Sequence, residues 1–225
     1  MKSSIPVTCH CGHQMTLQTS GTQDPKDAQC PACGTAFWFV KPLGNFVGMR
    51  IFNRAWVELG KGDVTLVIVL SAMAVECELA RMFIKWNEID LMNTGIPTPA
   101  DREALAEQWR KWNSIAVRFD MVSTLLVQED FDSFLSHNTE LLKPIHAKYP
   151  ASASCASPKD VFITEFFHKR NRIVHSGEID FQQPDGEKCF TLAATLFDIM
   201  KEMDERRLKV LDAKHAAQLK PTTLG

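Results

Sequence analysis

The chain has 225 residues, enough for one sizeable domain together with a small module. Apolar residues make up 45% and charged residues 23%, which is ordinary for a globular protein, and the formal net charge is -2. This balance excludes a globally basic surface of the kind that binds nucleic acid. Any contact with nucleic acid must therefore come from a local patch.

The sequence carries no recognisable signal for export or membrane insertion. Residues 1–6 do not combine a charged start with an apolar run. The most apolar stretch, 64–75, is shorter than the roughly 18 residues that a membrane-spanning helix needs, and Glu76, Glu78 and Arg81 follow it. The seven cysteines are odd in number and four have zinc-type spacing, which favours a reducing compartment. We expect a cytoplasmic protein with no membrane contact.

Residues 1–40 predict a small metal-binding module. They contain Cys-His-Cys-Gly at 9–12 and Cys-Pro-Ala-Cys-Gly at 30–34. Zinc prefers four tetrahedral ligands, and two close pairs of thiolates supply them. Each pair needs a tight turn, and the glycine after each pair tolerates the positive φ of such a turn. The predicted ligands of one structural zinc ion per chain are Cys9, Cys11, Cys30 and Cys33.

This module resembles a zinc ribbon, in which two such turns carry a few short strands. The expected strands are Val7-Thr8 before the first pair and 37–40 after the second. Four cysteines close the metal shell and no glutamate stands beside them as a base, so we interpret the zinc as structural. His10 and His13 are alternative ligands, although exposed turn positions fit them better. The module has no net basic charge, which favours docking to a protein partner over general phosphate binding.

The chain from residue 63 onward has the pattern of helices, with apolar residues at spacings of three and four. Helices are expected over 64–91, 101–128, 131–149, 159–174 and 188–213. Asp101 is the expected cap of the second helix, Ser157-Pro158 begins the fourth, and Gly177 ends it. Residues 181–187, which contain a proline and a glycine, are expected to form a loop.

The sequence therefore predicts a mainly α fold, an all-α helical bundle with a small N-terminal β zinc ribbon. Glycine and proline breaks mark a connector before the helical part, with a short helix over 46–59. The expected units are a zinc ribbon at 1–40, a linker at 41–62, a helical domain at 63–215 and a disordered tail at 216–225.

The most unusual helical segment is 166–177, Phe-Phe-His-Lys-Arg-Asn-Arg-Ile-Val-His-Ser-Gly. His168, Asn171 and His175 stand at i, i+3 and i+7 and so share one helix face. Arg170 lies about 100° from Asn171 around the axis, and from there its long side chain can reach towards His175. A purely structural role is the competing interpretation, because cations near a helix C-terminus complement the helix dipole and can cap carbonyls.

Arg170-Asn171, three further residues and His175 resemble the signature of the HEPN domain, named for higher eukaryote and prokaryote nucleotide-binding proteins. That family is an all-α bundle whose motif is an arginine, a following polar residue and a histidine after four to six intervening residues. Here four residues separate Arg170 from His175. The motif also ends the penultimate expected helix, as in the family. The family's first long helix often carries a glutamate, and Glu76 or Glu78 would fill that place.

Many HEPN proteins are metal-independent endoribonucleases, so the resemblance implies this activity. RNA supplies the nucleophile, its own 2′-hydroxyl. His175 can move protons near neutral pH, Arg170 offers a permanent fork of donors to phosphate oxygens, and Asn171 can orient either group. Further candidate substrate contacts are His168, Lys169 and Arg172. Dimerisation in the family places two motifs face to face, which implies a homodimer with the His175 residues near the two-fold axis.

Three functions remain open at this point. The first is a homodimer that cleaves RNA, in a defence or toxin setting. The second is a non-catalytic HEPN module that binds a nucleotide, RNA or a protein partner, with the ribbon as its docking arm. The third is a structural adaptor.

Some toxin members carry a tyrosine two residues after the histidine, but Gly177 stands here, so regulation at that tyrosine is not supported. Trp109 and Trp112 occur at helical spacing, so we interpret them as core residues rather than a base-stacking platform.

Overall fold

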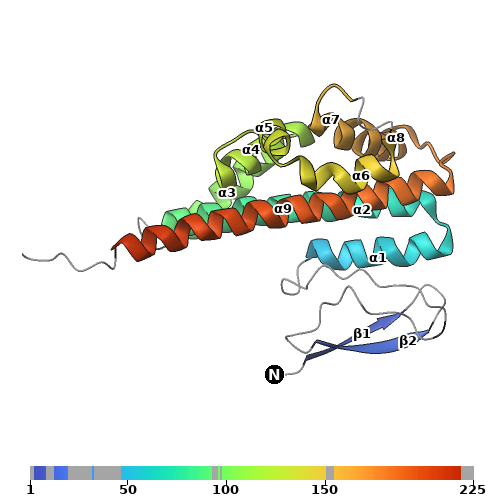
Figure 1. Cartoon of the computed structure of the whole chain (residues 1–225), viewed down its shortest axis with the longest axis horizontal. Coiled ribbons are helices and arrows are strands. Elements are labelled where there is room, and N and C mark those ends of the chain that lie inside the picture. The colour runs from blue at the N-terminus through green and yellow to red at the C-terminus, as the bar shows by residue number, and fades with distance from the viewer. Residues whose placement is uncertain are drawn as a thin grey trace, which may run out of the picture.

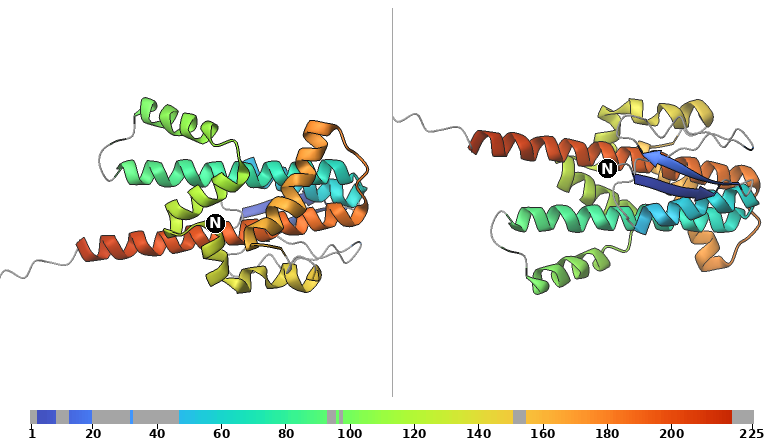
Figure 2. Two further views of the ribbon diagram at one scale, coloured as in Figure 1. Left: turned by 90° about the horizontal axis from the view of Figure 1, so that it is seen from above. Right: turned by 90° about the horizontal axis from the view of Figure 1, so that it is seen from below.

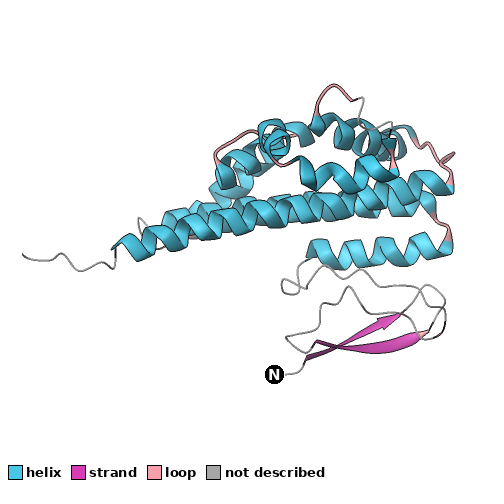
Figure 3. Ribbon diagram, viewed as in Figure 1, coloured by secondary structure: helices cyan, strands magenta, loops and turns pink. Residues whose placement is uncertain are grey.

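The computed structural model describes residues 3–8, 13–19, 32, 47–92, 96, 98–150 and 155–218. The four predicted zinc ligands, the expected strand at 37–40 and the last residues of the expected tail lie outside these ranges. The described part is mainly helical, which confirms the predicted fold class at that level (Figure 3). None of its helices is both long and apolar enough to cross a membrane.

Two antiparallel strands form a hairpin near the N-terminus, β1 (Ser3–Thr8) and β2 (Gln14–Thr19). The register pairs Ser3 with Thr19 at one end and Thr8 with Gln14 at the other. β1 includes the strand expected at Val7-Thr8. The paired ends at Thr8 and Gln14 bring together the chain on either side of residues 9–12, which contain the first cysteine pair.

The first described helix begins at residue 47, close to the short helix expected over 46–59. Its elements are α1 (Val47–Lys61), α2 (Val64–Met92), α3 (Pro99–Lys111), α4 (Ile115–Val127), α5 (Phe131–His137), the 3-10 helix η2 (Thr139–Leu142), α6 (Lys143–Lys148), α7 (Pro158–Phe162), the π-helical segment η4 (Ile163–Phe167), α8 (His168–Ser176) and α9 (Gln183–Gln218).

The two long helices α2 and α9 lie side by side and form the centre of the bundle (Figure 1). The shorter helices from α4 to α8 lie on one side of this pair and α1 on the other. Phe52 of α1 is buried and stacks on Phe190 of α9, with ring centroids 4.5 Å apart. The helix expected inside a linker at 41–62 is therefore packed into the core of the helical body.

The single helix expected over 101–128 is two helices, α3 and α4. Thr98 caps α3 instead of Asp101: its Oγ1 accepts from the Asp101 backbone N–H at 3.2 Å, and the Asp101 carboxylate accepts from the Thr98 N–H at 2.7 Å. This reciprocal pair is a capping box, so Asp101 contributes from the first turn rather than from the cap position.

Aromatic packing accounts for the break between α3 and α4. Trp112 leaves the helical conformation, with ψ of 90°. Trp109 and Trp112 both pack against Phe83 of α2, with ring centroids 5.5 and 5.0 Å away. The two tryptophans are thus partly buried against the core, which confirms the interpretation that they are core residues.

The remaining helices differ from expectation mainly at their ends. The helix expected over 131–149 is divided into α5, η2 and α6. Ser157 does begin α7, with its hydroxyl accepting from the Asp160 N–H at 3.3 Å, and Gly177 does end α8, with φ of 65°. The expected loop at 181–187 is wrong from Gln183 onward, because α9 begins there and packs Gly186 closely against Val64. α9 also continues to Gln218, into the expected tail.

A buried carboxylate joins the two central helices. Asp204 of α9 accepts from Lys85 Nζ at 2.9 and 3.0 Å and from Trp86 Nε1 at 2.5 Å, both on α2. Asp204 is only 7% exposed. One turn further along α9, Arg207 donates to both carboxylate oxygens of Asp90, at 2.7 and 2.8 Å. These polar contacts fix the register of α2 against α9.

Replacing Asp204 by alanine should destabilise the helical body, because it leaves a partly buried ammonium and a buried indole N–H without their acceptor. We expect the free energy of unfolding to fall by about 3 kcal/mol, measured by urea denaturation followed by circular dichroism. Asp212→Ala is the matched control, an exposed aspartate on the same helix, and should change the value by less than about 0.5 kcal/mol. Equal effects of the two variants would contradict this role for Asp204.

Candidate functional site

The polar motif at 166–177 lies on η4 and α8, which cross above one end of α2 (Figure 2). Phe166 and Phe167 are buried and anchor the start of α8 in the core. Gly177 ends the helix in the left-handed conformation, with its N–H donating to Ile173 O at 3.1 Å. No residue of α8 is fully buried. The motif is therefore a short helix that is fixed at both ends and open along its outer side.

The Arg170 side chain reaches from α8 towards α2. Its Nη2 lies 3.3 Å from Glu76 Oε1, and its Nη1 donates to Asn171 Oδ1 at 2.9 Å. The Nε atom is buried and has no hydrogen-bond partner within the described residues. Arg170 thus contacts Glu76 and Asn171. The sequence predicted that its side chain could reach towards His175, and the structure shows no such contact between these two described residues.

Glu76 also contacts a second arginine. Arg118 Nη1 of α4 lies 3.5 Å from Glu76 Oε2, so two guanidinium groups share one carboxylate where α2, α4 and α8 meet. Glu78 instead pairs with Arg81 of its own helix, at 2.8 Å from Nε. Of the two glutamates that the sequence left open, Glu76 is the one beside Arg170.

Two of the expected substrate-binding residues, Lys169 and Arg172, each form an ion pair with a carboxylate of this chain. Lys169 Nζ donates to Asp185 Oδ1 at 2.6 Å. Burial acts to raise the pKa of Asp185, but hydrogen bonds from Lys169 and from the Gln182 N–H outweigh it, so the pKa is lowered. Arg172 Nε donates to Glu178 at 2.6 Å. Lys169 and Arg172 are therefore neutralised in this arrangement.

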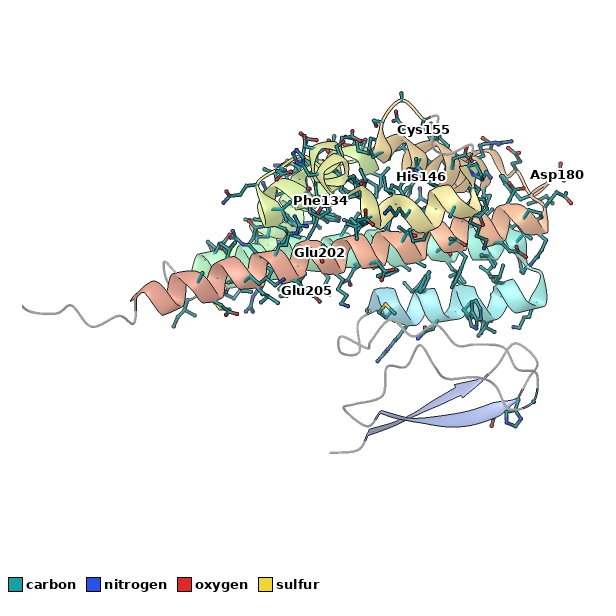
Figure 4. All side chains as sticks on the ribbon, viewed as in Figure 1. Phe134, His146, Cys155, Asp180, Glu202 and Glu205 are labelled. Carbon is teal, nitrogen blue, oxygen red and sulfur yellow. The ribbon has the colours of Figure 1, made fainter. Side chains whose placement is uncertain are left out.

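The two histidines of the motif are exposed on the surface of α8. His175 follows Asn171 by four residues and so lies on the same side of the helix. Neither its ring nor that of His168 makes a hydrogen bond or an ion pair within the described part of the chain. The loop that follows α8, marked by Asp180 in Figure 4, lies at one end of the helical body.

Arg118 is the member of this site that sequence reasoning did not select. Its Nε donates to the Trp112 carbonyl at 2.7 Å, and its Cζ lies 4.8 Å from the centroid of the Trp109 ring. Both contacts depend on the break between α3 and α4, which the hydrophobic pattern did not indicate. The sequence signal for Arg118 is its position soon after Trp109 and Trp112. The hydrophobic pattern predicts one continuous helix over 101–128, which does not bring Arg118 back to these tryptophans.

The site combines two guanidinium groups, one carboxylate, an amide and an exposed imidazole. The guanidinium groups can bind phosphate oxygens, and the imidazole can donate or accept a proton. Within the described ranges, no three His, Cys, Asp or Glu side chains are placed to hold a metal ion. The predicted zinc ligands lie outside those ranges.

Comparison of the chain with protein-family models, with curated proteins and with solved structures gives no match in any of the three. The function must therefore be inferred from the site itself.

Proposed function

We propose that the chain is a metal-independent endoribonuclease of the HEPN type. The observation that supports this most is the contact of Arg170 with Glu76 on the first long helix and with Asn171 on its own helix. The same short helix carries His175 exposed on the side where Asn171 lies. These are the residue types that the HEPN signature combines, and they occur here in a mainly helical fold.

The proposed reaction is transesterification at an RNA phosphodiester. The 2′-oxygen attacks the adjacent phosphorus and loses its proton, while the 5′-oxygen leaves and gains one. The products are a 2′,3′-cyclic phosphate and a 5′-hydroxyl end. Arg170 stabilises the charge that develops on the phosphate oxygens, and Asn171 orients a phosphate oxygen or the imidazole. His175 transfers one of the two protons, and the His175 of a second copy transfers the other.

Replacing His175 by alanine should lower RNA cleavage at least about 100-fold, because proton transfer to or from the reacting oxygens is lost. The assay uses purified full-length protein and mixed RNA in the presence of EDTA, with detection of 2′,3′-cyclic phosphate ends. His137→Ala is the matched control, since it is an exposed histidine on α5. Undiminished cleavage by His175→Ala would rule out this mechanism.

A non-catalytic module that binds RNA or a nucleotide is the second candidate. The observation that favours it is that no described residue holds the His175 ring in one orientation. Retention of RNA by the wild-type chain without any cleavage would support this function in place of the first.

A homodimer is the assembly that this reaction requires, and exposed apolar side chains around the site support it. They are Met73 on α2, Val117 and Met121 on α4 and Val174 on α8, between 36% and 51% exposed. Each lies within one helical turn of Glu76, Arg118 or Asn171 on its own helix. Exposed apolar groups around a polar site fit a self-complementary interface.

Val174→Asp should convert a dimer into a monomer, because it places a charge without a partner at the centre of the proposed interface. Size-exclusion chromatography with light scattering measures the mass. Val210→Asp is the matched control, a valine on α9 that is 44% exposed, against 51% for Val174. A monomeric wild-type chain, or a Val174→Asp variant that stays dimeric, would contradict the proposed assembly.

A structural zinc ion in the N-terminal module is also part of the proposal. Four thiolates suit zinc, and the β1–β2 hairpin supports a knuckle because its paired ends flank residues 9–12. Cys9, Cys11, Cys30 and Cys33 would hold the ion. The module would then serve as a folded arm that contacts a protein partner, and the proposed defence or toxin setting would determine that partner.

Replacing both Cys30 and Cys33 by serine should abolish zinc binding. We expect one zinc per wild-type chain and none in the variant, measured by mass spectrometry of the metal after dialysis. Cys155→Ser is the control and should keep the metal. Cys189 is less suited to metal binding, because burial raises the pKa of its thiol to about 12. A wild-type chain without zinc would contradict the proposed module.

A further inference from the structure

Arg118 and Arg170 are held by Glu76 at distances that leave their donors available. The two nitrogen–oxygen distances are 3.5 and 3.3 Å, longer than the roughly 2.7–2.9 Å of a charge-assisted hydrogen bond. The Arg81–Glu78 pair on the same helix does reach this range, since Arg81 Nε donates to Glu78 Oε2 at 2.8 Å. Glu76 therefore brings the two guanidinium groups together without forming close hydrogen bonds to either.

The Arg118 side chain is fixed before any ligand arrives. Its Nε donates a hydrogen bond to the Trp112 carbonyl, and its guanidinium group lies over the Trp109 ring. The side chain is 18% exposed. An arginine held in this way loses little conformational entropy when it binds, and its fork of N–H groups matches two oxygens of a phosphate.

The cations around the site differ in how far carboxylates neutralise them. Lys169 and Arg172 each have a carboxylate of their own, Asp185 and Glu178. Arg118 and Arg170 share a single one. The pair consequently keeps an excess of one positive charge. An anionic group is the ligand that fits these donors.

We propose that Arg118 is a second phosphate-binding residue of this site and that, together with Arg170, it holds the backbone of single-stranded RNA. The assignment of RNA as the ligand rests on the proposed function. Arg118 acts in binding rather than in proton transfer. It comes from α4, more than fifty residues before the Arg-Asn-x-x-x-His motif, and no part of that motif specifies it.

The test measures binding of a fluorescein-labelled 2′-O-methyl RNA, which cannot undergo attack by a 2′-hydroxyl. Fluorescence anisotropy is recorded over a series of salt concentrations with the full-length chain. Arg118→Ala should weaken binding about tenfold at low salt, since one charge-assisted contact is lost. The slope of log K against log salt should fall by about 0.7, the value for one phosphate contact on a single strand.

Arg110→Ala is the matched control, because it removes one exposed arginine from the neighbouring helix α3. It should leave both the affinity and the slope near the wild-type values. Arg118→Gln covers the case in which Arg118→Ala fails to fold, since glutamine keeps a polar side chain with an N–H donor and removes the charge. Circular dichroism melting curves identify which of the two variants is folded.

An Arg118 variant that is folded and has wild-type affinity and slope would overturn the proposal, as would a wild-type chain that does not bind the 2′-O-methyl RNA. Cleavage of ordinary RNA is measured separately. Arg118-dependent binding without cleavage leaves this inference standing and removes the endoribonuclease proposal. His175-dependent cleavage together with normal binding by the Arg118 variant supports the endoribonuclease proposal and removes the inference about Arg118.

Discussion

The helix α2 is apolar on nearly all of its sides, and this constraint organises the rest of the helical body. Its fully buried residues recur at spacings of three and four from Val64 to Trp86, and the residues between them are partly buried except Met73. A helix of this kind is stable only when neighbours cover it all round. α1, α3, α4, α9 and the η4–α8 segment provide that cover. The approach of α1 is close enough that a Cβ at Gly48 would lie 2.8 Å from the Ala74 carbonyl oxygen.

Polar groups of α2 pair with the helices that cover it, and they select which helices meet. Lys85 and Trp86 fix α9 through Asp204, whereas Glu76 contacts α4 and α8 through one arginine from each. A carboxylate with two cationic partners is a polar junction in a mostly apolar helix. The geometry of the candidate site thus follows from the packing of α2, and the site would not exist without the helices that cover it.

The sequence predicted the helical class, the start of α7 at Ser157 and the end of α8 at Gly177, because caps and glycine act locally. It did not predict the start of α9, where Pro184 and Gly186 resemble a loop. Proline is tolerated in the first turn of a helix, and the glycine allows a close approach to Val64. Arg170 and Asn171 could be selected as a motif, but Arg118 could not, since its place depends on tertiary packing of Trp109 and Trp112 against Phe83.

The π-helical segment η4 separates the cap at Ser157 from the motif on α8. A π-turn contains one residue more than an α-turn, so everything after it is rotated by about 100° relative to an uninterrupted α-helix. The Ser157 cap and the buried Phe162 can therefore stay in place while Arg170 faces Glu76. Without the additional residue, the same motif would point to another side of the helix. A single inserted residue is thus enough to turn a structural helix end towards α2, and the arginine pair is a feature that one insertion can create or remove.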